Sequence, residues 1–265
     1  MSFLSETREI LRRYGLKPEK KMGQNFLVNE RIIEMEAREA QLNSRDAVLE
    51  VGPGIGTLTQ ELLKKAGRVV AVEKSGAMVD ILRDRFGDDE KLHLIHGDFT
   101  KVELPHFDKV ISNIPYSISS SFIFKILSLD FEKAVVILQY EFARRLFAKP
   151  GTGDYSRISA AFSFLANGKI ISKVSPSAFY PPPRVYSAVV EIYPKEKPLN
   201  KDNYLRILNL IFPYRRKRLK KALKLGAERE GIEINIDNIP DASAEKRVFQ
   251  LTPEEIAEFT EMLGV

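Results

Sequence analysis

The stretch VLEVGPGIGTLT, from Val48 to Thr59, joins an apolar, β-branched run to an amphipathic helical pattern through alternating glycines. Gly52, Gly54 and Gly56 follow the predicted strand and precede the predicted helix. Because glycine has no side chain, backbone N–H groups and the N-terminus of the helix can come close to a ligand there. The stretch therefore predicts a ligand-binding turn after the first strand of an α/β sheet.

Short apolar runs alternate with amphipathic segments along the first two-thirds of the chain. The predicted strands are 47–51, 69–73, 92–96, 109–112 and 134–138, and the predicted helices are 57–66, 76–86 and 120–128. This alternation is typical of an open, doubly wound sheet of parallel strands. Two further predicted strands, 169–175 and 186–194, are separated by a short proline-rich segment, and this short connection favours an antiparallel pair.

The β character of the sequence ends near Lys197, and the pattern is helical from there to the C-terminus. We therefore expect two unequal domains: an α/β domain with an N-terminal extension over residues 1–196, and a helical domain over residues 197–265. A chain of 265 residues that is 44% hydrophobic is long enough to bury a full core.

The composition excludes several kinds of chemistry. The chain has no cysteine and three scattered histidines, which rules out disulfides, thiolate metal sites and cysteine nucleophiles, so we expect no metal site. No run approaches the roughly 20 apolar residues that a membrane helix needs. We expect a soluble, cytoplasmic and monomeric protein that does not bind membranes.

Taken alone, the glycine turn is compatible with a structural role or with any nucleotide ligand. A dinucleotide fingerprint would need glycine at position 57, where the chain has Thr57, so an NAD-dependent enzyme is disfavoured. Glu73 and Asp98 end the next two predicted strands, where acids can accept hydrogen bonds from ribose hydroxyls and from the adenine amine. Each acid alone can equally be a helix cap. Signals at three neighbouring strand ends together predict a pocket for S-adenosylmethionine.

A carboxamide, a proline and an aromatic ring end the fourth predicted strand, in the stretch KVISNIPYSISS, residues 109–120. The N-I-P-Y tetrad resembles the N/D-P-P-Y/F motif of amino methyltransferases, and the resemblance implies methylation of an exocyclic amine. In those enzymes the Asn side-chain oxygen and the next carbonyl, here Asn113 and Ile114, accept the amine hydrogens. Pro115 would stiffen the turn, and Tyr116 would stack on the base. A β-turn with a buried tyrosine is the structural alternative.

Three further segments resemble the ribosomal RNA adenine dimethyltransferase family. KKMGQNFLVNE, residues 20–30, is similar to the G-Q-N/H-F-L segment of that family. SAFYPPPRVYSAVV, residues 177–190, is similar to its F-x-P-x-P-K/R-V-x-S-x-V/L segment. QYEFARRLFAKPGTGDYSRIS, residues 139–159, resembles the archaeal and eukaryotic branch. The chain thus resembles the KsgA-type dimethyladenosine transferases of small-subunit ribosomal RNA.

That resemblance implies a Rossmann-like class I methyltransferase sheet of seven strands, the last antiparallel, with a small C-terminal helical domain. It implies dimethylation, from S-adenosylmethionine, of the N6 amines of two adjacent adenosines near the 3′ end of small-subunit ribosomal RNA or of the pre-ribosomal small subunit. The implied cofactor-binding residues are Asn25, Leu27, Gly52, Gly54, Gly56, Glu73, Lys74, Asp98, Phe99 and Asn113. The implied catalytic residues are Asn113, Ile114, Pro115, Tyr116 and Phe179. Phe179 would face the target base opposite Tyr116.

The segment RRKRLKKALK, residues 215–224, concentrates positive charge in a chain of net charge +5. Clustered cations gain affinity for RNA by releasing counterions, although a solvated helix face fits this composition equally well. The residues expected to bind RNA are Arg215, Arg216, Lys217, Arg218, Lys220 and Lys221. If the run is only a solvated face, the RNA contacts are expected near Arg8, Arg12, Lys17, Lys20 and Lys21.

Two other functions share part of these motifs. A resistance-type adenine methyltransferase of large-subunit ribosomal RNA has the same core motifs, but the segment 177–190 favours the small-subunit enzymes. A non-catalytic RNA-binding assembly or transcription factor would also retain a donor pocket. Intact Asn113 and Tyr116 favour a catalytic protein over such a binder.

Overall fold

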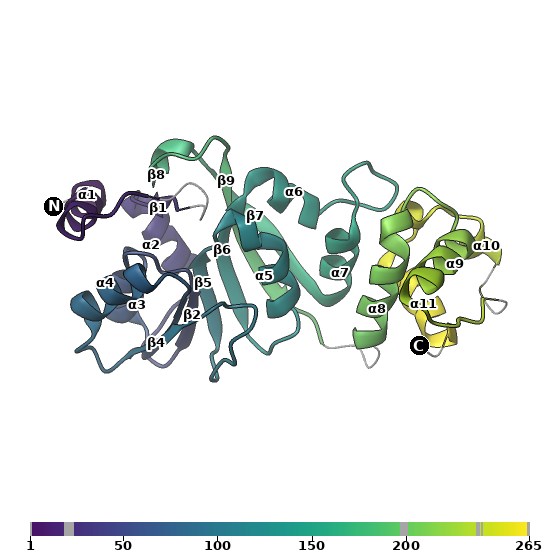
Figure 1. The fold of residues 1–265 in the computed structure, drawn as a ribbon, viewed down its shortest axis with the longest axis horizontal. Coiled ribbons are helices and arrows are strands. Elements are labelled where there is room, and N and C mark those ends of the chain that lie inside the picture. The colour runs from purple at the N-terminus through teal and green to yellow at the C-terminus, as the bar shows by residue number, and fades with distance from the viewer. Residues whose placement is uncertain (1, 19–23, 197–200, 237–238, 240, 264–265) are drawn as a thin grey trace. The chain divides into compact units, whose positions relative to one another are not determined.

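The computed structural model contains a seven-stranded sheet in the spatial order β4-β3-β2-β5-β6-β9-β7 (Figure 1). The described residues are 2–18, 24–196, 201–236, 239 and 241–263. The strands of this sheet are β2 (Ala47–Val51), β3 (Arg68–Glu73), β4 (Leu92–His96), β5 (Lys109–Asn113), β6 (Lys133–Gln139), β7 (Ala166–Val174) and β9 (Ser187–Pro194). Each strand predicted from the sequence is present.

Strand direction follows the prediction as well. β4, β3, β2, β5 and β6 pair in parallel, and β9 pairs antiparallel to β6. β9, the last strand along the described residues, lies between β6 and β7. The predicted Rossmann-like fold class, with seven strands and an antiparallel last strand, is therefore confirmed. In such a sheet the carboxyl ends of the parallel strands meet at one edge, which is where ligands bind.

A second, two-stranded sheet was not predicted. β1 (Phe26–Leu27) pairs antiparallel to β8 (Phe179–Tyr180), with Leu27 opposite Phe179. β8 lies in the proline-rich connection between β7 and β9, where the Tyr180–Pro181 peptide bond is cis. Strands of two residues carry too little periodicity to be found from a sequence. Their pairing brings the G-Q-N-F-L segment beside the proline-rich segment.

Helices follow most strands. In the first half of the chain they are α1 (Phe3–Arg13), α2 (Glu30–Glu39), α3 (Thr59–Lys65), α4 (Gly76–Phe86) and α5 (Ser119–Ile126), and α6 (Tyr140–Leu146) follows just past the middle. In the second half they are α7 (Arg157–Leu165), α8 (Lys201–Ile211), α9 (Leu219–Glu230), α10 (Asp241–Ala244) and α11 (Pro253–Leu263). Over the described part of the chain, none of them is long and apolar enough to cross a membrane.

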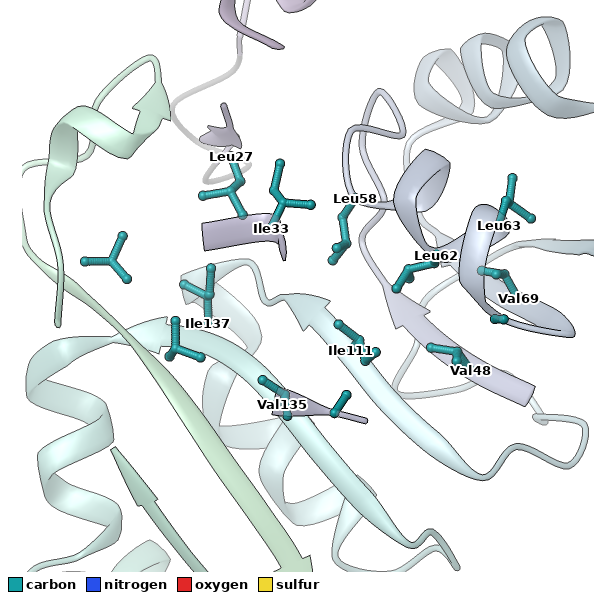
Figure 2. Packing of buried hydrophobic residues seen from close by; sticks show 14 of the residues in the cluster. Leu27, Ile33, Val48, Leu58, Leu62, Leu63, Val69, Ile111, Val135 and Ile137 are labelled. Atoms are coloured by element: carbon teal, nitrogen blue, oxygen red, sulfur yellow. The ribbon is translucent and has the colours of Figure 1, made fainter. Parts of the chain in front are cut away.

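A core cluster of buried hydrophobic residues lies between one face of the sheet and helices α2 and α3. Side chains alternate along each strand, so one face of β2, β5 and β6 presents a continuous apolar layer. Figure 2 shows this layer grouped with residues of α2, α3 and β1: Val48, Ile111, Val135 and Ile137 with Leu27, Ile33, Leu58 and Leu62. Each fully buried Leu or Ile stabilises the fold by about 1.5–3 kcal/mol. This packing fixes the strand ends that form the site.

The chain divides into two compact units, and the second includes a segment from the middle of the sequence. The first unit is Met1–Ala143 with Gly168–Tyr193, and the second is Arg144–Asn167 with Pro194–Val265. In the second unit the rings of Phe164 and Tyr204 stack with centroids 3.9 Å apart. The sequence-based boundary, at residues 196 and 197, falls beside residues 197–200, which are outside the described residues, and it stays a prediction.

The last glycine of the turn packs against α4. Gly56 has a φ of +87°, and a Cβ atom there would lie 2.4 Å from Cε2 of Phe86. Gly56 does not line the cavity described below. Its predicted role in cofactor binding stays a prediction, but the structure supplies an independent reason for glycine at this position.

A single arginine of α4 links helix α1 to the glycine turn and to α3. The guanidinium of Arg85, in α4, donates to the carboxylate of Glu6 and to the carbonyl of Ile55. It also donates to Oε1 of Gln60 at 3.0 Å. Because Glu6 belongs to α1, Ile55 to the glycine turn and Gln60 to α3, one guanidinium joins three segments of the chain.

Substitution of Gly56 tests this packing. We expect Gly56→Ala to lower the free energy of unfolding by about 2–5 kcal/mol, because a positive φ costs about 1–2 and displacing the Phe86 ring costs about 1–3. Gly15→Ala is the matched control, since Gly15 has a φ of +62° and a Cβ atom there would meet no atom within 4 Å. Urea unfolding followed by circular dichroism measures both. Equal costs for the two variants would contradict tight packing at Gly56.

Candidate active site

A cavity of about 200 Å³ lies at the carboxyl ends of β2, β3 and β5. Most of the site residues predicted from the sequence line it: Asn25, Leu27, Gly52, Gly54, Glu73, Lys74, Asp98, Phe99, Asn113, Ile114, Pro115 and Tyr116. Of the residues predicted to bind the cofactor or to take part in catalysis, two lie outside its lining, Gly56 and Phe179. The proposed donor residues and the N-I-P-Y turn therefore share one pocket.

The glycine turn presents bare backbone to this cavity. Gly52 and Gly54 have φ values of +73° and +60°, a conformation that side chains rarely adopt. A Cβ on Gly52 would lie 3.1 Å from the Pro115 ring, and one on Gly54 would lie 3.0 Å from the Phe26 ring. A side chain at either position would therefore press on Pro115 or Phe26, which both line the cavity.

Glu73 ties the glycine turn to the start of α4. Its Oε2 accepts from the backbone N–H of Gly54 at 3.1 Å, and its Oε1 accepts from the N–H of Ser75 at 2.8 Å. Burial raises the pKa of Glu73, while these backbone hydrogen bonds act in the opposite direction. Each carboxylate oxygen can accept more than one hydrogen bond, so the side chain retains capacity for the hydroxyls of a ribose.

Asp98 is an ionised acceptor at the rim of the cavity. It accepts from the hydroxyl of Thr100 at 2.7 Å and from its N–H at 3.0 Å, and it pairs with Lys74 Nζ at 2.9 Å. The hydrogen bond from the Thr100 hydroxyl and then that from Lys74 hold the pKa of Asp98 well below its usual range. The ion pair with Asp98 holds the Lys74 side chain at the rim of the cavity.

The N-I-P-Y turn is held at both ends. Asn113 Nδ2 donates to the carbonyl of Asn25 at 3.2 Å, which leaves the carboxamide oxygen to act as an acceptor. The N–H of Ile114 donates to the carbonyl of Ile137 at 3.2 Å. The hydroxyl of Tyr116 lies 2.6 Å from Oγ of Ser187. These contacts fix the carboxamide, the Ile114 backbone and the ring relative to one another.

Phe179 lies in β8 and is buried in the core cluster, only 3% exposed. In this structure it does not line the cavity, although its partner Leu27 does. The predicted contact between Phe179 and a target base therefore stays a prediction, and it requires a rearrangement that exposes the ring.

Sequence reasoning missed several residues of the cavity. Phe26, Met78 and Glu50 line it. Phe26 was within the G-Q-N-F-L segment, and Met78 lies in the first turn of the helix after Glu73. Glu50 is an acid inside an otherwise apolar strand, and this unusual position was the available signal.

Two buried acids interact with each other at the site: Glu50, which lines the cavity, and Glu36, which is near Glu50. Glu50 is 1% exposed, and its Oε2 accepts from the hydroxyl of Thr59 at 2.7 Å. Burial raises the pKa of Glu50 to about 8; the Thr59 hydrogen bond opposes the rise, and the charge of Glu73 adds to it. Glu36, in α2, is fully buried, and its carboxylate oxygens have no hydrogen-bond partner among the described residues. Burial and then the charge of Glu50 raise the pKa of Glu36.

The sheet order, the glycine turn and acids at successive strand ends define a methyltransferase of the S-adenosylmethionine-dependent class. The model of the family "Ribosomal RNA adenine dimethylase" matches residues 15–263. The chain therefore belongs to the ribosomal RNA adenine dimethylase family, whose members are enzymes that use S-adenosylmethionine. The family predicted from the sequence is confirmed.

Relatives and solved structures agree with this assignment. The chain is 44% identical, over 96% of its length and 95% of the relative, to the probable ribosomal RNA small subunit methyltransferase A of Pyrococcus furiosus. It resembles the structure of a dimethyladenosine transferase from Plasmodium falciparum, with a TM-score of 0.74, 28% identity, and coverage of 91% of this chain and 98% of that chain. It also resembles the 23S rRNA methyltransferase ErmE, with a TM-score of 0.63, 26% identity, and coverage of 91% and 100%.

The buried state of Glu50 predicts a pH dependence of stability. Its folded pKa is raised from 4.5 to about 8, so its contribution to stability is present below pH 4.5 and is lost as the pH rises through about 8. Glu50→Gln keeps an acceptor for Thr59 and does not ionise. We expect this variant to gain up to a few kcal/mol relative to wild type across that window.

Urea unfolding at a series of pH values measures this difference. Glu103→Gln is the control, because it makes the same chemical change at an exposed position. A constant difference between Glu50→Gln and wild type over the whole pH range would show that Glu50 does not titrate as described.

Proposed function

We propose that the protein dimethylates the N6 amines of two adjacent adenosines near the 3′ end of small-subunit ribosomal RNA during ribosome assembly. The proposal rests on one observation: the N-I-P-Y turn, 113–116, lines the same cavity as Glu73 and Asp98. A methyl donor held by the acids would thus be next to the acceptor turn. The naming of the Pyrococcus furiosus relative as a small-subunit methyltransferase supports the choice of subunit.

The residues of the cavity fit S-adenosylmethionine. Glu73 offers acceptors for a ribose, and the ionised Asp98 offers one for the adenine amine. Asn25 and Leu27 line the cavity from the N-terminal segment and would contact the methionine part of the donor. When bound, the donor supplies a methyl group on a positively charged sulfonium.

Asn113 and Ile114 prepare the acceptor amine. An amine conjugated to a ring is a weak nucleophile, and two oxygens that accept its hydrogens raise the density of its lone pair. The hydrogen bonds to Asn25 and Ile137 hold the Asn113 carboxamide and the Ile114 backbone in place, which supports this role. The Tyr116 ring offers a stacking surface for the base, worth about 1–3 kcal/mol.

Positioning supplies most of the acceleration in this scheme. Well-aligned reactants gain up to about 7–11 kcal/mol from proximity. Transfer disperses the positive charge of the donor, so a partly dry pocket favours it. Burial raises the pKa of Tyr116 above its ordinary value of 10.0, so this residue keeps its proton near neutral pH. The amine's proton can leave to water after transfer.

Two alternatives are less well supported. The likeness to ErmE is compatible with action on large-subunit RNA, but the segment 177–190 and the higher identity to the Pyrococcus furiosus relative favour the small subunit. A non-catalytic binder would not need the ordered contacts of Asn113 and Tyr116. We further propose that the protein acts as a monomer in the cytoplasm, which is where ribosome assembly would need it.

Substitution of Asn113 distinguishes a role in methyl transfer from a role in donor binding. We expect Asn113→Ala to lower the transfer rate at saturating RNA and saturating donor roughly a hundredfold, as loss of one preorganised polar group does in other enzymes, and to affect donor affinity much less than Glu73→Gln does. The assay follows label from S-adenosylmethionine onto unmethylated small subunits, and calorimetry measures the donor. Glu73→Gln is the comparison, because it should weaken donor binding. Wild-type transfer rates in Asn113→Ala would refute the role of the turn.

The basic run surrounds the N-terminus of α9 in the second unit. Arg216, Lys217 and Lys221 are exposed. Arg218 pairs with Glu245 at 2.5 Å, and both side chains are exposed. The distribution is compatible with a surface that contacts RNA phosphates.

Arg215 differs from the others because it has a structural role. Its Nη1 donates to the carbonyl of Tyr155 at 2.6 Å, and its Nη2 donates to that of Gly153 at 3.0 Å. Its substitution would disturb the second unit, so an RNA-binding test is better made without it. Of the alternative basic residues, Lys20 and Lys21 lie outside the described residues.

The proposed RNA contact predicts a change in salt dependence. We expect the triple variant Arg216→Gln, Lys217→Gln, Lys221→Gln to weaken binding to small subunits, and to flatten the plot of log affinity against log salt by up to about 0.7–0.9 per lost phosphate contact. Donor affinity should not change. The control replaces Lys64, Lys65 and Arg68 with Gln, since these exposed residues lie near the amino end of β3, away from the carboxyl edge. Equal salt slopes in both variants would mean that the run is a solvated face.

A further inference from the structure

Two tyrosines and a lysine form a partly exposed cluster that the proposed mechanism does not use. Nζ of Lys173 lies 4.0 Å from the ring centroid of Tyr186 and 4.7 Å from that of Tyr140. Lys173 is in β7, Tyr186 directly precedes β9, and Tyr140 begins α6. We refer to these three residues as the tyrosine–lysine cluster.

The register of the sheet places this cluster at the edge that carries the N-I-P-Y turn. Asn113 pairs with Ile137 of β6, and two residues further along β6 Gln139 pairs with Ser187. Ser187 is the partner of the Tyr116 hydroxyl, at 2.6 Å. Tyr186 is therefore one residue away from the contact that holds Tyr116, on the acceptor side of the cavity.

The cluster is both fixed and open to solvent. The N–H of Tyr140 donates to the carbonyl of Tyr186 at 2.9 Å, so the backbones that carry the two rings are joined. Tyr186 is nevertheless 49% exposed, and its neighbour Val185 is 42% exposed. A large ring held in place but left half in water contributes little to folding and offers a surface to a ligand.

The chemistry of the cluster fits a nucleotide. Aromatic side chains stack on bases without regard to sequence, and a nearby lysine neutralises phosphate. An adenine inside an RNA helix cannot reach a closed pocket, so the target base must leave the stack of bases. The base next to it then loses the stacking contact that it made with the target base. The cluster lies at the same edge of the sheet as the turn that would hold the target base.

We propose that the tyrosine–lysine cluster holds the nucleotide next to the target adenosine: Tyr186 stacks on its base and Lys173 contacts its phosphate. This inference rests on the proposed function, because it assumes an RNA substrate. It adds a positioning surface outside the donor cavity, on the first unit, that is separate from the basic run of the second unit.

Direct binding to unmethylated small subunits tests the inference, with Tyr186→Ala, Tyr186→Phe and Lys173→Gln. Tyr186→Ala should raise the dissociation constant about tenfold, while Tyr186→Phe, which keeps the ring, should stay within about twofold of wild type. Lys173→Gln should flatten the salt plot by about 0.7–0.9, the value for one phosphate. The same fold-changes are expected on protein-free small-subunit RNA, and donor affinity measured by calorimetry should stay at the wild-type value.

Several results would overturn the inference. Unchanged binding of Tyr186→Ala would exclude stacking, and an equal loss in Tyr186→Phe would assign the effect to the hydroxyl. Loss on whole subunits but not on protein-free RNA would point to a ribosomal protein as the partner. Weakened donor binding would make the cluster a structural support of Tyr116. Methyl transfer by wild type on the same subunits is scored separately, so failure of the proposed function is distinguished from failure of the cluster.

Discussion

Glu73 accepts hydrogen bonds from the backbone of Gly54 and of Ser75, and it thereby holds the glycine turn and the start of α4 in one arrangement. Without an acceptor here, two backbone N–H groups would lose their partner, at a cost of about 1–3 kcal/mol each where they are buried. The α4 N-terminus also favours negative charge through its dipole. The same carboxylate that would bind a ribose is thus needed to shape the turn, so donor recognition and local folding cannot be separated at this residue.

Two other acids associated with the site are almost completely buried, more deeply than Glu73. Glu50 and Glu36 are both buried, and the carboxylate of Glu36 lacks a hydrogen-bond partner within the described part of the chain. Groups of this kind cost stability and are rarely retained without a reason. Glu50 lines the cavity and its charge acts on Glu36, which links this cost to the site. Leu and Ile side chains of the adjoining cluster supply the compensating apolar burial.

The predictable part of the site is the part that repeating geometry controls. Parallel strands end at one edge, so glycines and acids at strand ends could be brought together from the sequence alone, and Gly52, Glu73, Asp98 and Asn113 do line one cavity. The rest depends on contacts between distant segments. No local sequence pattern predicts the pairing of β1 with β8 or the burial of Phe179. The same is true of the two hydrogen bonds that Arg215 donates to backbone carbonyls. The assignment of Arg144–Asn167 to the second unit also depends on contacts between segments that are distant in the sequence, so it could not be predicted from a local pattern.

Arg85 joins α1, the glycine turn and α3 through a single guanidinium, although α1 contributes no residue to the cavity lining. Any ligand that stabilises the glycine turn in the arrangement that Arg85 holds must therefore also stabilise the docking of α1, since linkage is reciprocal. Detachment of this helix would loosen the donor side of the pocket, and occupation of the pocket would hold the helix down. By this coupling helix α1 would contribute to the affinity of the cavity for a ligand, although it contributes no residue to the lining.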